Sequence, residues 1–282
     1  MDSLVSTEWL AAHLDDPALL ILDATAHLPA AGRNAQSEFV AGHIPGACHL
    51  DLATFKDATS PVPNALPTGE QVSSRLASLG WTPQRQIVHY DDSAVKTSAR
   101  AWFALRRAGV DAALLDGGLA KWKAEALPLE TGASESVHAD QSRLDVDMSR
   151  DRSKAQMFAN IAAAREQVID ARDADRFTGA TVDTVHDLPG GHIPGARNLH
   201  FRDLYRPDGT FRPMQELRTA FERARIDLSR PIVASCGSGV TASVLIFALH
   251  LLGVGHAALY DGSWAEWGAD AAMPRETGYG PP

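Results

Sequence analysis

The sequence predicts an α/β fold made of two tandem domains, each a mostly parallel sheet flanked by helices. Two observations lead to this prediction. The 282-residue chain contains the same series of segments twice, and in each copy short apolar runs typical of strands alternate with helical patterns. Hydrophobic residues make up 45% of the chain, which is enough for two ordinary hydrophobic cores.

The duplication is visible in matching segments of the two halves. The hexapeptide Gly-His-Ile-Pro-Gly-Ala occurs at 42–47 and again at 191–196. An Asp-Gly pair at 116–117 recurs at 261–262, and a Glu-Thr-Gly at 130–132 recurs at 276–278. The nearly constant separation indicates a duplicated domain. We expect a first domain over residues 1–130, a polar linker over 131–157 and a second domain over 158–282.

Strands and helices are predicted in the same order in both halves. The predicted strands are 19–23, 87–90 and 113–116 in the first half, and 167–170, 232–235 and 257–260 in the second. Helices are predicted over 98–108 and 242–252. The second helix is apolar nearly all round, which predicts that it is buried, and Gly253 should end it.

Composition excludes several classes of function. No stretch approaches the roughly 18 consecutive apolar residues of a membrane span, and the first residues lack the features of a secretory signal. The net charge of −9 does not favour nucleic acid. The two cysteines, Cys48 and Cys236, are too few for a disulfide framework and suit a reducing compartment. We therefore expect a cytoplasmic protein that binds neither nucleic acid nor a membrane.

The segment around Cys236 carries the strongest chemical signal. A predicted strand ends at Ser235, a short glycine-containing loop follows, and the buried helix begins. Such a loop turns backbone N–H groups towards one concave site, which binds anions and favours a thiolate at its start. A lone cysteine is more often a core residue, but this context favours a nucleophile. The matching loop of the first half, 91–97, has neither cysteine nor glycine, so we expect no catalysis there and a packing role for Cys48.

Spacing separates the enzyme classes that use such loops. A cysteine phosphatase needs an arginine six residues after the cysteine, and Ala242 stands there. A serine hydrolase elbow needs glycines on both sides of its serine, but Ser238 has Cys236 and Val240 at those positions. The phosphate-binding Gly-Lys-Ser/Thr loop is absent from the sequence. A thiolate in an uncharged amide cradle remains, and that suits sulfur transfer.

These residues resemble the two-domain rhodanese family. The resemblance rests on Cys-Gly-Ser-Gly-Val-Thr at 236–241, the two Gly-His-Ile-Pro-Gly-Ala turns and Asp-Gly-Ser-Trp at 261–264, and it covers essentially the whole chain. The loop has the form typical of 3-mercaptopyruvate sulfurtransferases. The resemblance implies an enzyme whose Cys236 takes sulfane sulfur as a persulfide and passes it to cyanide, a small thiol or a thioredoxin-like protein. It implies no metal and no organic cofactor.

The resemblance also implies further site residues. Gly237, Gly239, Val240 and Thr241 form the substrate-binding loop with Cys236. Arg176 matches an arginine that binds the anionic group of the donor; the alternative is a surface ion pair with Asp173 or Asp175. Ser238 matches a serine linked to proton movement; the alternative is a hydrogen bond to the loop backbone.

Three positions depart from the family pattern. Val185, with His186 beside it, stands where mercaptopyruvate enzymes typically have a second arginine. Ala53 and Asn64 stand where the family often has an acidic residue and a histidine. His186 could serve as a donor in place of the arginine if it is protonated or suitably aimed.

Other repeated residues are expected to be structural. His43 and His192 precede Ile-Pro-Gly in both halves, and the half without the cysteine keeps its histidine, so both should serve the turn. Trp264 and Trp267 are expected to pack in the core of the second domain. The alternative for Trp264 is a position at the border of the substrate cleft. Two other functions stay open at this point: a thiosulfate sulfurtransferase of the same fold, and a binding or regulatory module without turnover.

Overall fold

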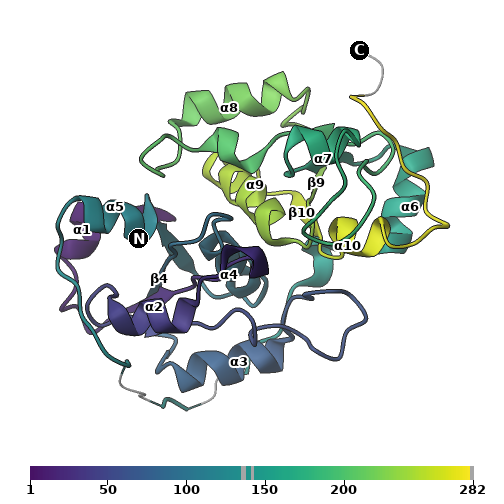
Figure 1. The fold of residues 1–282 in the computed structure, drawn as a ribbon. Helices are drawn as coiled ribbons and strands as arrows, with labels where there is room; N and C mark the ends of the chain where they lie inside the picture. Colours follow the sequence, from purple (N-terminus) through teal and green to yellow (C-terminus); the bar gives the residue numbers. More distant parts are fainter. Residues whose placement is uncertain (135–137, 141–142, 280–282) are drawn as a thin grey trace. The chain divides into compact units, whose positions relative to one another are not determined.

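The computed structural model describes residues 1–134, 138–140 and 143–279 (Figure 1). The chain forms two compact units. The first unit contains Met1–Asp57, Leu66–Asp147 and Arg206–Phe211, and the second contains Ala58–Ala65, Met148–Tyr205 and Arg212–Pro282. Each unit has its own parallel five-stranded sheet flanked by helices, which confirms the predicted fold class.

The sheet of the first unit has the strand order β1-β5-β4-β2-β3, and every pairing is parallel. Its strands are β1 Leu4–Val5, β2 Leu19–Asp23, β3 Cys48–His49, β4 Gln86–Tyr90 and β5 Ala112–Leu115. The helices are α1 Thr7–Ala11, α2 Ala35–Ala41, α3 Gly69–Ser78, α4 Ser98–Arg107 and α5 Gly118–Ala124, with a 3₁₀ turn η1 at Pro29–Ala31.

The sheet of the second unit repeats this order as β6-β10-β9-β7-β8. Its strands are β6 Asp151–Arg152, β7 Gln167–Asp170, β8 Arg197–Asn198, β9 Ile232–Ser235 and β10 Ala257–Tyr260. The helices are α6 Lys154–Ala163, α7 Ala174–Thr178, α8 Met214–Arg223, α9 Val240–Leu251 and α10 Ser263–Trp267, with 3₁₀ turns η2 at Met148–Arg150 and η3 at Phe201–Leu204.

The apolar strands have nearly the predicted bounds. β2, β7, β9 and β10 match them residue for residue, β4 begins one residue earlier, and β5 is shifted by one residue. The α4 and α9 helices also occupy the predicted positions, α9 starting two residues earlier. The bounds of the linker stay a prediction; β6 and the first turn of α6 lie within 131–157.

The helix starts follow from local sequence. Thr68 and Gln71 form a capping box at α3, in which each side chain accepts a hydrogen bond from the other residue's backbone N–H. Ser153 and Gln156 do the same at α6. Gly239, in the left-handed conformation at φ +77°, precedes the first residue of α9 and allows the tight approach from β9.

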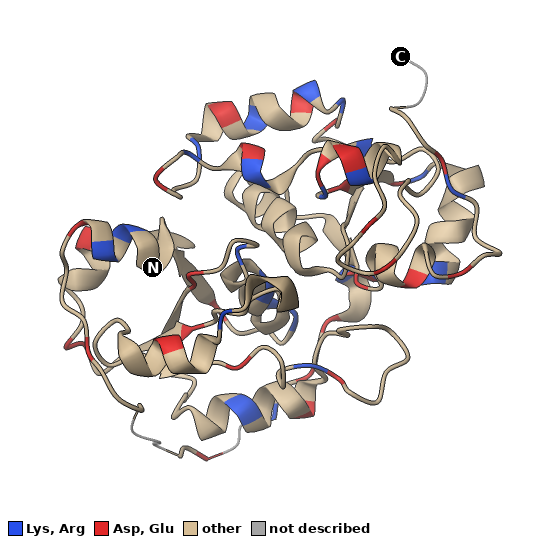
Figure 2. Cartoon of the chain, viewed as in Figure 1, with Lys and Arg blue, Asp and Glu red and all other residues tan. Residues whose placement is uncertain are grey.

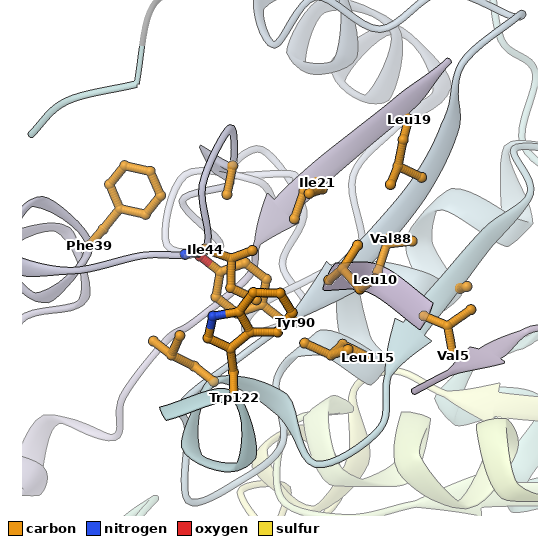
Figure 3. Close-up of a cluster of buried hydrophobic side chains, with 13 residues drawn as sticks. Val5, Leu10, Leu19, Ile21, Phe39, Ile44, Val88, Tyr90, Leu115 and Trp122 are labelled. Carbon is orange, nitrogen blue, oxygen red and sulfur yellow. Dashed lines mark hydrogen bonds between the residues drawn. The ribbon is translucent and has the colours of Figure 1, made fainter. Parts of the chain in front are cut away.

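The core of the first unit lies between its sheet and helices (Figure 3). Tyr90 of β4 and Trp122 of α5 are both fully buried there and pack with aliphatic side chains of β2 and β4. Trp122 Nε1 donates a hydrogen bond to the Pro128 carbonyl at 2.7 Å, so its one polar atom is satisfied. In the second unit, Trp267 takes the matching role and donates to the Pro274 carbonyl at 2.8 Å.

The α9 helix is buried along most of its length, as its apolar sequence predicts. Every residue from Ala242 to Leu249 is buried. Charged residues lie elsewhere: Figure 2 shows acidic and basic residues interspersed along α8 rather than separated by sign. None of the described helices is long and apolar enough to cross a membrane.

Candidate active site

The loop after β9 places Cys236 at the carboxyl end of a central strand. Cys236 is 1% exposed and is joined by a short turn to α9. Ligand sites of parallel α/β sheets lie at this edge of the sheet, because the strand ends and helix starts meet there. Gly237 and Gly239 are also buried, whereas Ser238, Val240 and Thr241 are half-buried.

The carbonyl side of the loop is held by the start of α10. The backbone N–H of Trp264 donates to the Cys236 carbonyl at 3.0 Å, and that of Ala265 donates to the Gly237 carbonyl at 2.8 Å. Ser263 Oγ accepts from the Cys236 N–H at 3.1 Å and donates to the Tyr260 carbonyl at 2.8 Å. These bonds fix the loop with its carbonyl groups turned towards α10.

The amide side of the loop is left open. Within the described residues, no carbonyl or side chain accepts a hydrogen bond from the N–H groups of residues 237–241. Donors of this kind at a helix start bind anions, and the partial positive charge of the helix N-terminus adds to the effect. The loop itself contains neither lysine nor arginine, so within the loop only these backbone groups attract an anion.

The side chain of Asn64 contacts the backbone of the Cys236 loop. The segment Ala58–Ala65 belongs to the second unit, and Asn64 Nδ2 donates to the Ser238 carbonyl at 3.3 Å. The residue in the expected histidine position thus contacts the loop as a hydrogen-bond donor. The part of Ser238 in proton movement stays a prediction.

Arg176, on α7, makes the ion pair that the sequence offered as the alternative role. Its Nε lies 2.6 Å from Asp173 Oδ2, and its Nη1 lies 3.5 Å from Asp183 Oδ1. The side chain remains 21% exposed, so part of the guanidinium can still be reached by an anion. Donor binding by Arg176 therefore stays a prediction.

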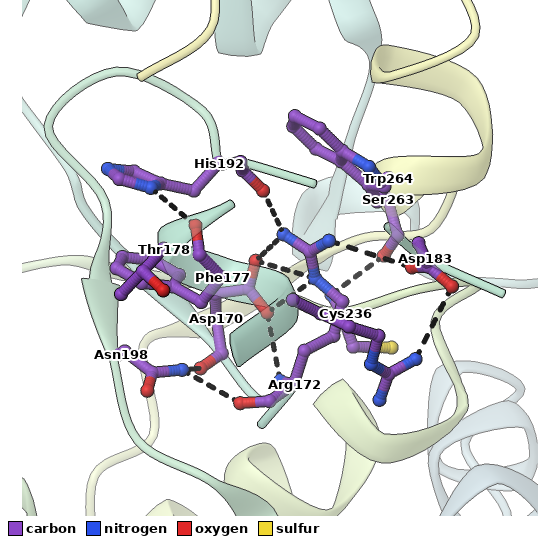
Figure 4. Close-up of polar contacts among 12 residues, drawn as sticks. Asp170, Arg172, Phe177, Thr178, Asp183, His192, Asn198, Cys236, Ser263 and Trp264 are labelled. Atoms are coloured by element: carbon purple, nitrogen blue, oxygen red, sulfur yellow. Dashed lines mark hydrogen bonds and ion pairs between the residues drawn. The ribbon is translucent and has the colours of Figure 1, made fainter. Parts of the chain in front are cut away.

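A second arginine, which sequence reasoning missed, is buried beside the cysteine (Figure 4). Arg172 is 1% exposed and pairs with both carboxylate oxygens of Asp170, the closer at 2.7 Å from Nη2. Its guanidinium carbon lies 4.6 Å from the ring centre of Trp264. Burial alone would lower the pKa of Arg172, but the carboxylates of Asp170 and Asp183 and the sulfur of Cys236 raise it overall.

Asp183 connects the two arginines to a histidine. The carboxylate is fully buried, and His186 Nδ1 lies 3.0 Å from its Oδ1. Arg172 Nη1 lies 3.6 Å from its Oδ2. Burial opposes ionisation, but the hydrogen bond from His186 and the positive charges of His186, Arg176 and Arg172 lower the pKa of Asp183 to about 2. This carboxylate is therefore ionised at neutral pH.

His186 lies directly against the loop that follows Cys236. A methyl group on Gly237 would lie only 2.2 Å from His186 Cε1 and 3.0 Å from its Nε2. The glycine is therefore required by the closeness of the ring. Val185, the residue in the expected arginine position, is 42% exposed, and its backbone N–H donates to Asp183 Oδ1 at 3.1 Å.

The two repeated histidines make the same kinds of contact in the two units. His43 stacks on Phe39, and His192 stacks on Phe177, each with 3.9 Å between ring centres. Nδ1 of each is hydrogen-bonded to the carbonyl of the phenylalanine on which it stacks, at 2.8 and 2.9 Å. This geometry supports the interpretation that both histidines serve the turn. Trp264 is 1% exposed and donates from Nε1 to the Pro189 carbonyl, which agrees with a packing role.

Comparison with known proteins agrees with this arrangement. The rhodanese-like domain family matches residues 6–125 and 153–270, so the chain belongs to this family, with two tandem copies of the domain. The chain is 38% identical over 277 residues to the 3-mercaptopyruvate sulfurtransferase of Escherichia coli (strain K12), covering 96% of this chain and 97% of that protein.

Two further relatives extend the comparison. A protein of Arabidopsis thaliana named mitochondrial thiosulfate/3-mercaptopyruvate sulfurtransferase 1 is 33% identical over 297 residues, covering 98% of this chain and 78% of that protein. The crystal structure of SseA from Escherichia coli, described as a 3-mercaptopyruvate sulfotransferase with the rhodanese fold, has a TM-score of 0.82 at 35% identity. It covers 94% of this chain and 99% of that one.

Proposed function

We propose that this protein is a sulfurtransferase that moves sulfane sulfur from 3-mercaptopyruvate, through a persulfide on Cys236, to a thiol or to cyanide. One observation carries the proposal: Cys236 begins a loop whose backbone N–H groups from 237 to 241 are unused by the described part of the chain. An uncharged amide cradle can hold the thiolate and then the persulfide anion in place. The names of the relatives at 38% and 33% identity support the same activity.

Each of the site residues expected from the sequence has a separate proposed role. Cys236 is the nucleophile, and Gly237, Gly239, Val240 and Thr241 supply the cradle. Arg176 keeps a partly exposed guanidinium that can pair with the donor carboxylate. Sulfurtransferases take sulfur from small molecules and give it to small-molecule acceptors; a thioredoxin-like protein is a further proposed acceptor here. The low number of cysteines, two in the whole sequence, supports a reducing compartment such as the cytoplasm.

Intact mass spectrometry tests the proposal. The protein is exposed briefly to 3-mercaptopyruvate or, separately, to thiosulfate, as wild type, Cys236→Ser and Cys48→Ser. We expect one added sulfur atom from 3-mercaptopyruvate in the wild type and in Cys48→Ser, and none in Cys236→Ser. The Cys48 variant is the matched control, because Cys48 is the only other cysteine in the sequence. Loading from neither donor would reject the proposal.

Thiosulfate is the second candidate donor, because the Arabidopsis relative carries both donors in its name. Thiosulfate is a dianion, and the loop has no lysine or arginine to neutralise the second charge. Faster loading from thiosulfate than from 3-mercaptopyruvate would favour this second candidate.

A further inference from the structure

The segment between α7 and the second Gly-His-Ile-Pro-Gly-Ala turn holds one histidine in a fixed orientation. Asp183 and Leu188 form an antiparallel bridge across this segment, with backbone hydrogen bonds of 2.8 and 3.1 Å. Asp183 Oδ1 accepts from the backbone N–H groups of Val185 and His186, and it also faces His186 Nδ1. The ring and the backbone of His186 are thus both tied to one buried carboxylate.

This contact determines which ring nitrogen is available. An ionised carboxylate only accepts hydrogen bonds, so the hydrogen on His186 Nδ1 is directed at Asp183. Nε2 is then the ring nitrogen that does not face the carboxylate. It lies beside Gly237, the residue after Cys236, and the side chain is 16% exposed, so a small molecule in the cradle can reach it.

The charged groups around His186 do not balance one another when its ring is neutral. Three carboxylates, from Asp170, Asp173 and Asp183, are held by the two arginines Arg172 and Arg176. With His186 neutral this group carries one unpaired negative charge, and a proton on His186 balances it. An anionic donor at the loop and the Cys236 thiolate would add further negative charge near the ring.

We propose that His186 is the acid that protonates the three-carbon leaving group when sulfur is taken from 3-mercaptopyruvate, with Asp183 as its positioning residue. This inference rests on the proposed function. In the step, the Cys236 thiolate attacks the donor sulfur, the S–S bond forms and the C–S bond breaks. The electron pair of that bond goes to C3 of the donor as an enolate, and the proton on His186 Nε2 is transferred to it.

Atoms and electrons balance in this step. The thiolate, the thiol form of 3-mercaptopyruvate and one proton give Cys–S–SH and pyruvate. C3 is reduced by two electrons, and each of the two sulfur atoms is oxidised by one. His186 recovers its proton from water. The later transfer of sulfur to a thiol releases no carbon leaving group, so that half-reaction does not use His186.

The test compares His186→Gln and His186→Arg with the wild type. Glutamine can still donate a hydrogen bond but cannot give up a proton, and arginine keeps a charge that it does not release near neutral pH. We expect the rate of pyruvate formation to fall about 100-fold in both variants, as is typical for the loss of an acid catalyst, with KM within about twofold of the wild type. The alkaline limb of the wild-type pH profile should be absent from both.

Two controls separate this role from a structural one. After long exposure to 3-mercaptopyruvate, every variant should carry the persulfide and discharge it to dithiothreitol at the wild-type rate. His256→Gln, at an exposed histidine of the same unit, should behave as the wild type throughout. If His186→Gln alters folding, as judged by thermal unfolding, His186→Asn replaces it in the same measurements.

The outcomes distinguish the two proposals. Wild-type loading together with unchanged pyruvate formation in His186→Gln would overturn the role of His186 and leave the proposed function intact. Restoration of the rate by His186→Arg would also overturn it, because a fixed positive charge would then be sufficient. If the wild type itself takes no sulfur from 3-mercaptopyruvate, the proposed function fails and the role of His186 fails with it.

Discussion

The loop that follows the central strand differs between the two units in one decisive side chain. Tyr90 pairs with Asp23 in the first sheet as Ser235 pairs with Asp170 in the second, so Asp91 occupies the position of Cys236. The Asp91 carboxylate accepts from the N–H of Ser93 and from the N–H of Ser98, both at 2.8 Å. The first loop therefore fills its amide site with its own side chain, whereas the second leaves the site open.

The next position differs in the same sense. In the first unit it is Asp92, and Arg33, from the segment before α2, donates to its Oδ2 at 2.9 Å. In the second unit it is Gly237, and the ring of His186, from the segment after α7, takes the space of a side chain. In both units a side chain from a neighbouring segment contacts the loop. Only in the second unit is that side chain a histidine ring beside open amide groups. The two units thus differ in a few side chains around this loop and not in the order of strands in the sheet.

The largest effect should come from making the second loop like the first. We expect Cys236→Asp to remove sulfur loading completely, because a carboxylate is no nucleophile towards sulfur and takes the amide groups itself. The thermal unfolding transition should remain cooperative and close to that of the wild type, since Asp91 shows that the loop accommodates this side chain. Intact mass after exposure to 3-mercaptopyruvate checks the first point, and calorimetry checks the second. Any remaining loading would place the nucleophile elsewhere.

A smaller effect should follow from a methyl group at Gly237. In Gly237→Ala the new methyl group would overlap the His186 ring. The ring must then move away from the loop and strain its hydrogen bond with Asp183. We expect pyruvate formation to fall about 10- to 100-fold, the range for a small misplacement of reacting groups. Gly255→Ala is the matched control, since a methyl group there meets nothing within 4 Å and should leave the rate unchanged. An unaffected Gly237→Ala would show that the ring contact is dispensable.

The smallest effect concerns stability and a core histidine that only the first unit has. His89 of β4 is completely buried, neither ring nitrogen has a hydrogen-bond partner in the described residues, and burial lowers its pKa to about 3. The matching residue in β9 is Ala234. Because the folded-state pKa lies below the unfolded value of about 6.5, stability is full above that pH and is lost as the pH falls towards 3.

His89→Leu should remove this loss. At pH 5 the wild type should be less stable than at pH 8 by about 2 kcal/mol from this group alone, and the variant should be less sensitive by that amount. Denaturant unfolding at the two pH values measures the difference, with the exposed His256→Leu expected to follow the wild type. Equal pH sensitivity in all three proteins would mean that His89 does not control it.

The apolar pattern of the sequence was sufficient to locate the central strands. β2, β7, β9 and β10 were predicted with their observed bounds because both faces are buried and the apolar runs are continuous. The outer strands were harder: β1, β3, β6 and β8 have two residues each, too few for a pattern to be recognised. The Cys236 loop was found from sequence because a cysteine between a strand and an apolar helix is a local signal.

The polar network around the cysteine could not be predicted in the same way. Asp183 lies in the polar sequence Thr-Val-Asp-Thr-Val-His at 181–186, which looks like an exposed loop, yet its carboxylate is fully buried. The burial depends on Arg172 and Arg176, which are near only after the chain has folded. Arg172 had one usable signal: it follows the buried Asp170 by two residues at the end of a strand.

The burial of α9 limits how far the backbone of the Cys236 loop can move when a sulfur atom is added. A helix covered on all sides from Ala242 to Leu249 cannot tilt or slide without exposing core surface, so the amide groups at its start should keep their positions when the proposed sulfur transfer takes place. If Cys236 carries the sulfur as proposed, the open amide side of the loop should make room for the additional atom without movement of the backbone. Such a site should need little reorganisation between its free and its sulfur-loaded state.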